Sequence, residues 1–145
     1  MNCLILSLFF FTVFGTNFSI DFNSQLEWVN DLNMAKKLAQ QKGKPIFLLL
    51  YKPWCSICKI FSRELFDSDY LVELSKKFVM VKIQEDINEE EFAPDGTYVP
   101  RILFLSKDGK VMKDIYNEKG SKSYLYYYVT QKQILSSMHL AIDSA

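Results

Sequence analysis

Two cysteines, Cys55 and Cys58, are the residues of this 145-residue sequence best suited to chemistry. They lie in Trp54-Cys-Ser-Ile-Cys-Lys59, directly after an apolar run and at the start of a predicted helix. At a helix N-terminus, unpaired backbone N–H groups and the helix dipole favour an anion. Lowering a cysteine pKa from about 8.5 to about 7 corresponds to about 2 kcal/mol of thiolate stabilisation. The spacing therefore predicts thiol–disulfide exchange, with Cys55 as an accessible nucleophile.

Cys58 lies one helical turn beyond Cys55, and we expect it to be the less exposed of the two. After Cys55 forms a mixed disulfide with a substrate, Cys58 can attack that bond and release the substrate. We therefore assign Cys58 as the resolving residue. Lys52 and Lys59 flank the pair and are predicted to help tune the pKa of Cys55, although solvated lysines contribute little.

The Cys55–Cys58 pair has three other interpretations. A closed zinc site takes four ligands, and the only histidine, His139, lies some eighty positions further along the chain. A Cys–His hydrolase needs a histidine beside its nucleophile, and nothing in the sequence places His139 there. The third alternative stays open: a non-enzymatic module of the same fold that holds client peptides, as a chaperone or a secreted signal would. Retention of both cysteines favours the enzyme, because a pure binder does not need Cys58.

The N-terminal segment is typical of a secretory signal peptide, predicted over residues 1–15. The first twenty residues carry no charged side chain, and the apolar run is shorter than the roughly 20 residues that span a bilayer. A buried N-terminal element and an uncleaved anchor are the alternatives. Cleavage removes Cys3 and leaves the Cys55–Cys58 pair, which closes too small a loop to be a structural staple.

Residues 16–145 are predicted to form one α/β domain with a central mixed sheet flanked by helices. Seventeen basic residues balance seventeen acidic ones, so composition gives no electrostatic case for nucleic acid or for a membrane once the signal is cleaved. Apolar runs predict buried strands, and Lys107-Asp-Gly-Lys110 predicts a turn into an edge strand. The predicted strands are 46–51, 78–83, 101–105 and, at the edge, 111–115.

Helix signals fill the intervals between these strands. The capping-box spacing Ser24-Gln-Leu-Glu27 predicts that a first helix begins there and ends before Gly43. Further helices are predicted at 55–66, 69–77 and from Thr130 onward. The segment 84–98 is rich in Asp and Glu and is interpreted as a solvated acidic loop at the rim of the site.

These residues resemble the thioredoxin superfamily, and more narrowly the small single-domain thioredoxin-like proteins of the endoplasmic reticulum, of the thioredoxin domain-containing protein 12 and anterior gradient type. The resemblance rests on Lys44-Pro45, Trp54-Cys-x-x-Cys-Lys59, Phe78-Val-Met-Val81 and Phe92-Ala-Pro-Asp-Gly-Thr-Tyr-Val-Pro-Arg-Ile-Leu-Phe-Leu105. It implies a thioredoxin fold and a protein-disulfide oxidoreductase of the reductase or isomerase type. Disulfide-containing client proteins and glutathione are the implied partners, with no bound cofactor and no metal.

The same resemblance implies two substrate contacts. Val99-Pro100 would be a cis-proline loop opposite the cysteines, with the backbone of Val99 turned toward a substrate peptide. Trp54 would be an exposed contact for substrate, the alternative being ordinary packing against the active-site helix.

Three departures from the family pattern matter. Leu49 stands where thioredoxins and protein disulfide isomerases carry a buried acid, so that base is absent or supplied by Glu85 or water. Ile57 stands in place of a proline or a histidine, which predicts a less oxidising pair than a histidine-containing motif gives. The chain ends Ile142-Asp-Ser-Ala145 without a retention signal of the Lys-Asp-Glu-Leu type, so we expect the endoplasmic reticulum lumen or secretion.

Overall fold

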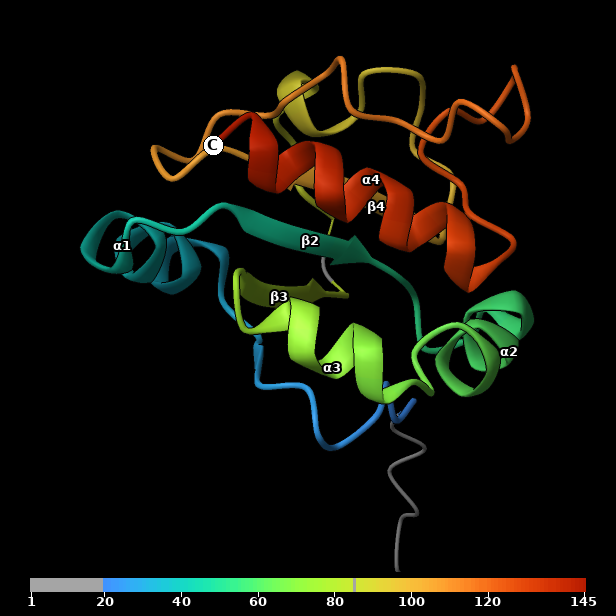
Figure 1. Ribbon diagram of the computed structural model, residues 1–145. Helices are drawn as coiled ribbons and strands as arrows, with labels where there is room; N and C mark the ends of the chain where they lie inside the picture. Colours follow the sequence, from blue (N-terminus) through green and yellow to red (C-terminus); the bar gives the residue numbers. More distant parts are fainter. Residues whose placement is uncertain (1–19, 85) are drawn as a thin grey trace, which may run out of the picture.

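The computed structural model describes residues 20–84 and 86–145. In this part of the chain, four strands form one sheet in the order β1-β3-β2-β4 (Figure 1). β3 runs parallel to both β1 and β2, and β4 runs antiparallel to β2. The strands are β1 (Trp28–Val29), β2 (Ile46–Leu50), β3 (Val79–Ile83) and β4 (Arg101–Leu105). The predicted mixed sheet is confirmed.

Four α-helices cover the sheet, and each begins at a residue whose side chain accepts a hydrogen bond from a backbone N–H in the first turn. In Figure 1, α1 and α2 lie at opposite ends of the molecule, with β2 and β3 between them. The helices are α1 (Leu32–Lys42), α2 (Ser56–Glu64), α3 (Asp69–Ser75) and α4 (Gln131–Asp143), and a single 3₁₀ turn, η1 (Glu90–Phe92), follows β3. None of the helices in the described ranges is long and apolar enough to cross a membrane.

The first helix begins later than the sequence predicts. Asp31, not Ser24, is the N-cap, and its carboxylate accepts from the Met34 N–H at 2.6 Å. Trp28 and its neighbour form β1 instead, because the indole packs edge-on against aromatic rings beneath the sheet and donates from Nε1 to the Phe22 carbonyl at 2.6 Å. Tertiary contacts of this kind override a local capping pattern. The predicted end at Gly43 is confirmed by its left-handed backbone, at φ 62°.

The predicted edge strand at 111–115 is wrong. Val111 makes one isolated bridge to Leu105, and residues 112–130 contain neither a helix nor a strand. The Val111 N–H donates to the carboxylate of Glu91 at 3.0 Å. The bridge to β4 uses the neighbouring Met112 N–H, which donates to the Phe104 carbonyl at 2.8 Å, so the Val111 N–H points away from β4. The ladder goes no further because the Ile115 N–H donates back to the Met112 carbonyl at 3.0 Å.

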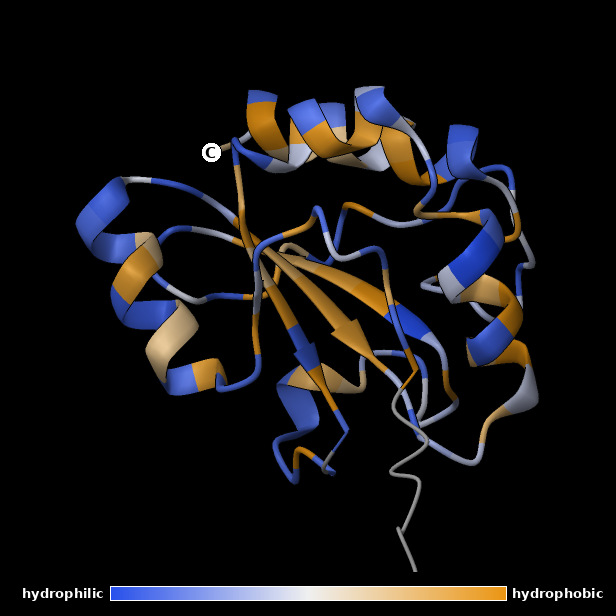
Figure 2. Cartoon of the chain, turned by 90° about the horizontal axis from the view of Figure 1, so that it is seen from below, coloured by the Kyte–Doolittle hydropathy of each residue, from blue (hydrophilic) through white to orange (hydrophobic). Residues whose placement is uncertain are grey.

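The two faces of the sheet carry separate hydrophobic cores. On the first, which we call the cysteine face, both cysteines pack with aromatic side chains from β2 and β4 and with apolar residues of α2, α3 and α4. On the second, which we call the Arg101 face, mostly aliphatic side chains of the strands pack against α1. Figure 2 shows the strands as largely hydrophobic and the helices as alternating between polar and apolar. The predicted signal peptide at 1–15 lies outside the described residues and stays a prediction.

Candidate active site

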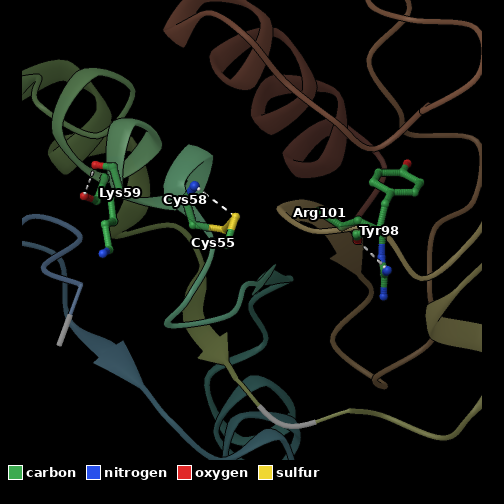
Figure 3. The surroundings of a disulfide bond; sticks show 6 residues. Cys55, Cys58, Lys59, Tyr98 and Arg101 are labelled. Atoms are coloured by element: carbon green, nitrogen blue, oxygen red, sulfur yellow. Dashed lines mark hydrogen bonds between the residues drawn. A yellow bond between two sulfur atoms is a disulfide. The ribbon is translucent and has the colours of Figure 1, made fainter. Parts of the chain in front are cut away.

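Cys55 lies at the N-terminus of α2, where the sequence predicts it. It is the N-cap residue of this helix, and its Sγ accepts a hydrogen bond from the Cys58 backbone N–H at 3.1 Å (Figure 3). Its own N–H donates to the Lys52 carbonyl at 3.1 Å, which closes a turn between β2 and α2. This position directs a helix dipole and a backbone donor at the sulfur, and both favour a thiolate.

Cys55 and Cys58 form a disulfide bond, with their Cα atoms 5.2 Å apart. Cys58 is fully buried and Cys55 is 7% exposed, so the predicted order of exposure is confirmed. The sulfur of Cys55 is less accessible than predicted, because the residue packs into the core of the cysteine face beside Val99. Cys55, the proposed nucleophile, keeps the larger exposed fraction of the two cysteines.

Large apolar side chains surround the disulfide on the solvent side. Trp54 is 74% exposed and Ile57 is 49% exposed. Ile60, one turn further along α2, is exposed as well. The indole of Trp54 is therefore free to contact another molecule and is not packed into the helix.

The Val99–Pro100 peptide bond is cis, as the resemblance implies. Pro100 is buried, and Val99 is half-buried against the core that contains both cysteines. The loop before β4 and the N-terminus of α2 therefore meet at one core.

The two flanking lysines are placed differently from each other. Lys52 donates to the Gln84 carbonyl at 2.6 Å and forms an ion pair with Asp86 at 2.8 Å. Lys59 lies exposed on α2, and Figure 3 shows its ammonium directed away from the disulfide. A role for either lysine in tuning the pKa of Cys55 stays a prediction.

Leu49 is fully buried in the same core as Cys58. Its partner on β3 is Lys82, a residue that sequence reasoning did not single out. The Lys82 ammonium lies 5.7 Å from the ring centroid of Phe22 and 5.8 Å from that of Trp28. Burial lowers the pKa of Lys82, and the charge of Asp21 opposes that shift. The sequence could have indicated this residue, because a lysine interrupts the apolar run of β3.

The segment 84–98 is not simply a solvated acidic loop. Phe92 is fully buried, and the Asp95 carboxylate accepts from the Tyr98 hydroxyl and from the Leu125 N–H, both at 2.7 Å. The Tyr98 hydroxyl in turn accepts from the Tyr126 N–H at 3.0 Å. Burial and the hydrogen bond to Asp95 raise the pKa of Tyr98. Acidic residues here are structural partners, which composition alone does not reveal.

His139 lies on the exposed side of α4, where its Nε2 is 2.9 Å from the Tyr70 hydroxyl. Within residues 20–84 and 86–145, no group of three or more His, Cys, Asp or Glu side chains comes together as metal ligands would. His139 is therefore a surface residue and lies apart from the cysteines.

A family model described as thioredoxin-like matches residues 27–107. Anterior gradient protein 3 from Xenopus tropicalis is 25% identical over 118 residues, which cover 81% of this chain and 72% of the relative. The human anterior gradient protein 2 homolog is 23% identical over 118 residues, covering 81% of this chain and 67% of the relative.

Two solved structures share the architecture. A DsbH oxidoreductase matches with a TM-score of 0.57 at 17% identity, covering 86% of this chain and 89% of its own. A thioredoxin from Thermus thermophilus matches with a TM-score of 0.57 at 16% identity, covering 80% of this chain and 86% of its own. The predicted thioredoxin fold is confirmed.

Proposed function

We propose, from the premise that this chain belongs to the thioredoxin-like family, that it is a thiol–disulfide oxidoreductase acting on protein disulfides of the secretory pathway. One observation carries the proposal. The Sγ of Cys55 caps the helix that contains Cys58, and the two residues are disulfide-bonded there. The N-terminal signal-like segment supports a place in the endoplasmic reticulum lumen or outside the cell.

In the reducing direction, the Cys55 thiolate attacks one sulfur of a client disulfide. A mixed disulfide forms, and the other client sulfur leaves as a thiolate and takes up a proton. Cys58 then loses its proton and attacks Cys55, which releases the second client thiolate and forms the Cys55–Cys58 disulfide. Two electrons pass to the client. A thiol reductant such as glutathione restores the dithiol, becoming a disulfide itself.

The assigned roles follow from the relative burial of the two sulfurs. Both residues are buried, but Cys55 keeps 7% exposure and Cys58 none, so Cys55 is the one that a client would reach first. Trp54, with its exposed indole, and the backbone of Val99 beside Pro100 are the proposed contacts for the client peptide. Leu49 leaves no carboxylate at its own position, so the proton of Cys58 goes to water or to another base.

A second candidate function is a client-binding module without turnover. The low exposure of Cys55 and the exposed apolar surface of Trp54, Ile57 and Ile60 favour it. The same surface would hold an apolar client segment whether or not exchange follows. The two candidates differ in whether the cysteines are consumed and regenerated.

Insulin reduction with a glutathione-linked regenerating system separates these candidates. We expect turnover by the wild type, background rates for Cys55→Ser, and mixed disulfides with clients trapped by Cys58→Ser and detected by mass spectrometry. Both variants should show wild-type far-UV circular dichroism, which controls for folding. Equal rates for all three proteins, or adducts on Cys55→Ser in place of Cys58→Ser, would contradict the proposal.

A further inference from the structure

A cavity of about 300 Å³ lies where β2 and β3 end, on the Arg101 face of the sheet. Its lining includes apolar Ile83, the hydroxyl-bearing Thr97, and three charged residues, Lys52, Asp86 and Arg101. Thr97 and Asp86 come from the segment that connects β3 to β4. The rest of the lining is mostly apolar: Leu50, Tyr51, Ile87, Asn88 and Val99. A few charged groups on an apolar wall are the usual lining of a small-ligand site.

Arg101 is a buried cation that lies over the Tyr98 ring, with its guanidinium carbon 5.5 Å from the ring centroid, and it lacks an anionic partner in the described ranges. The residue is 7% exposed, and its two terminal nitrogens donate to the carbonyls of Tyr98, at 2.6 Å, and Phe92, at 3.4 Å. Its Nε is buried without a hydrogen-bond partner, and none of the carboxylates in the described ranges lies within ion-pair distance of it.

An arginine in this setting favours an anionic partner. Removing a guanidinium from water is costly unless a carboxylate or a full set of acceptors replaces the water. Burial lowers the pKa of Arg101, and the charges of Asp95 and Asp86 offset part of that shift from a distance. A carboxylate bound to the planar guanidinium would supply the missing charge.

The cavity is connected to the redox pair on two sides. The carbonyl of Lys52 accepts from the Cys55 N–H at 3.1 Å, so this wall and the nucleophile belong to one turn. Val99 also lines the cavity and packs against the core that holds both cysteines. Lys52 and Val99 thus belong both to the cavity wall and to the surroundings of the redox pair, so a group one or two residues from a sulfur bound at Cys55 is the part of a substrate that we expect to reach the cavity.

Asp86 is the one acidic residue among the described residues of the lining, and it limits what binds. Its carboxylate pairs with Lys52 at 2.8 Å, yet its side chain is 82% exposed. Exposed ion pairs contribute little to stability and exchange easily with solvent or with a competing carboxylate. We therefore expect Lys52 to be a secondary contact and Arg101 the principal one.

We infer that this cavity is a subsite for a carboxylate next to the reactive sulfur of the substrate, with Arg101 as its main hydrogen-bond donor. The inference rests on the proposed function, because it assigns the substrate class of the same site. Two sources share this chemistry: an acidic side chain beside the client cysteine, and a carboxylate of glutathione.

Paired disulfide peptides test the subsite. The peptides carry Asp or Asn at one position, scanned over two residues on each side of the cysteine, and the measurement is the Asp-to-Asn ratio of kcat/KM. We expect the wild type to prefer Asp by about tenfold at one position, as a charged hydrogen bond allows. Arg101→Gln should bring the ratio close to one. Because each ratio is taken within one protein, a general loss of activity cancels.

Three further variants keep the test decisive. Arg63, the other arginine of the chain, lies exposed on α2, and Arg63→Gln should leave the ratio unchanged. Asp86→Asn should raise the ratio, because it removes the competing carboxylate. Should Arg101→Gln not fold, Arg101→Lys and Asp86→Asn carry the test, with Arg101→Lys expected to keep a reduced preference for Asp.

Oxidised glutathione and its glycine ethyl ester form the second arm. A preference for free glutathione over the ester, lost in Arg101→Gln, identifies the small thiol as a source of the carboxylate, whereas a preference confined to the peptides identifies the client. A ratio near one for every substrate in the wild type, or a ratio unchanged in Arg101→Gln, overturns the subsite. Absence of cysteine-dependent turnover with all substrates would instead overturn the proposed function.

Discussion

The two faces of the sheet are packed with different kinds of side chain. On the cysteine face, aromatic rings meet edge to face around Phe47, whose ring centroid lies 5.3 Å from that of Phe104. On the Arg101 face, aliphatic side chains pack against α1, and a network of polar groups closes the end of the sheet. The two faces meet where β4 begins. Val99 packs against the core of the cysteine face, and Arg101, two residues later, belongs to the other face.

This difference separates the sulfur chemistry from substrate selection. On the cysteine face Cys58 is fully buried, with Leu49 where a carboxylate would have been expected. Charged groups able to recognise a substrate lie on the opposite face, at Lys52, Asp86 and Arg101. A change beside the cysteines should therefore alter redox properties, and a change at Lys52, Asp86 or Arg101 should alter specificity, whereas core substitutions on either face should alter stability.

The largest expected losses of stability are those of Phe47→Ala and Leu103→Ala. Both side chains are fully buried, one on each face. Phe47→Ala should lower the free energy of unfolding by about 3–5 kcal/mol and Leu103→Ala by about 2–4 kcal/mol. The phenylalanine should cost more, because it loses ring contacts with several aromatic neighbours as well as buried area. Urea unfolding of the oxidised proteins measures both, and a larger loss for Leu103→Ala would contradict the contrast.

A smaller effect is expected when the polar network is broken. Tyr98→Phe removes the donor to Asp95 and the acceptor for the Tyr126 N–H. Leaving these groups unpaired should lower the free energy of unfolding by about 1–3 kcal/mol. Tyr124→Phe is the matched control, because this half-exposed ring stacks edge-on against Tyr98 and should change stability by less than about 0.5 kcal/mol. A loss for Tyr98→Phe no larger than that for Tyr124→Phe would contradict a stabilising role for the hydrogen bonds of the Tyr98 hydroxyl.

Much of the cysteine face could be predicted from the sequence. Local sequence signals predict its elements: the apolar run of β2, the position of Cys55 at the start of α2, and the capping box at Thr130. The structure contains all three. These signals act over a few residues, and burial on the sheet reinforces them.

The Arg101 face was harder to predict, because its contacts join segments that are far apart in the sequence. Asp95 accepts from the Leu125 N–H thirty positions later, and Glu91 accepts from the Val111 N–H twenty positions later. A cluster of Asp and Glu gives no sign of which carboxylates find such partners. The later start of the first helix, at Asp31, also results from a contact between distant segments, because Trp28 packs against the ring of Phe66.

Ile57→His tests the redox part of the comparison. The side chain of Ile57 is half-exposed between the cysteines, so a histidine fits there without repacking the core. An imidazolium beside Cys55 stabilises the thiolate, and hence the reduced form, so the reduction potential should rise by about 30 mV, equivalent to about 1.4 kcal/mol. Ile60→His, one turn along α2 and equally exposed, is the control and should shift it far less. Equilibration with glutathione buffers measures the potential, and equal shifts would exclude a local effect.

The smallest effect is expected from Tyr126→Phe, and it should grow only at alkaline pH. Burial, aided by the negative charge of Asp95, raises the pKa of Tyr126 to about 12. In the unfolded chain a tyrosine loses its proton near pH 10. Between about pH 10 and pH 12 the folded protein therefore binds the proton that the unfolded chain has lost, and the free energy of unfolding falls as the pH rises.

Tyr126→Phe should make that fall shallower. Tyr98 and Tyr128, whose pKa values are also raised, should retain the remainder. The measurement is urea unfolding at pH 7, 9, 10 and 11. The free energy of unfolding of each protein is compared with its own value at pH 7. This comparison cancels the constant effect of losing the hydrogen bond from the Tyr126 hydroxyl to the Lys113 carbonyl. The exposed Tyr124→Phe variant should follow the wild-type curve. Parallel curves for wild type and Tyr126→Phe would show that the buried hydroxyl is ionised as easily as one in water, and that the Arg101 face is open to solvent at this position.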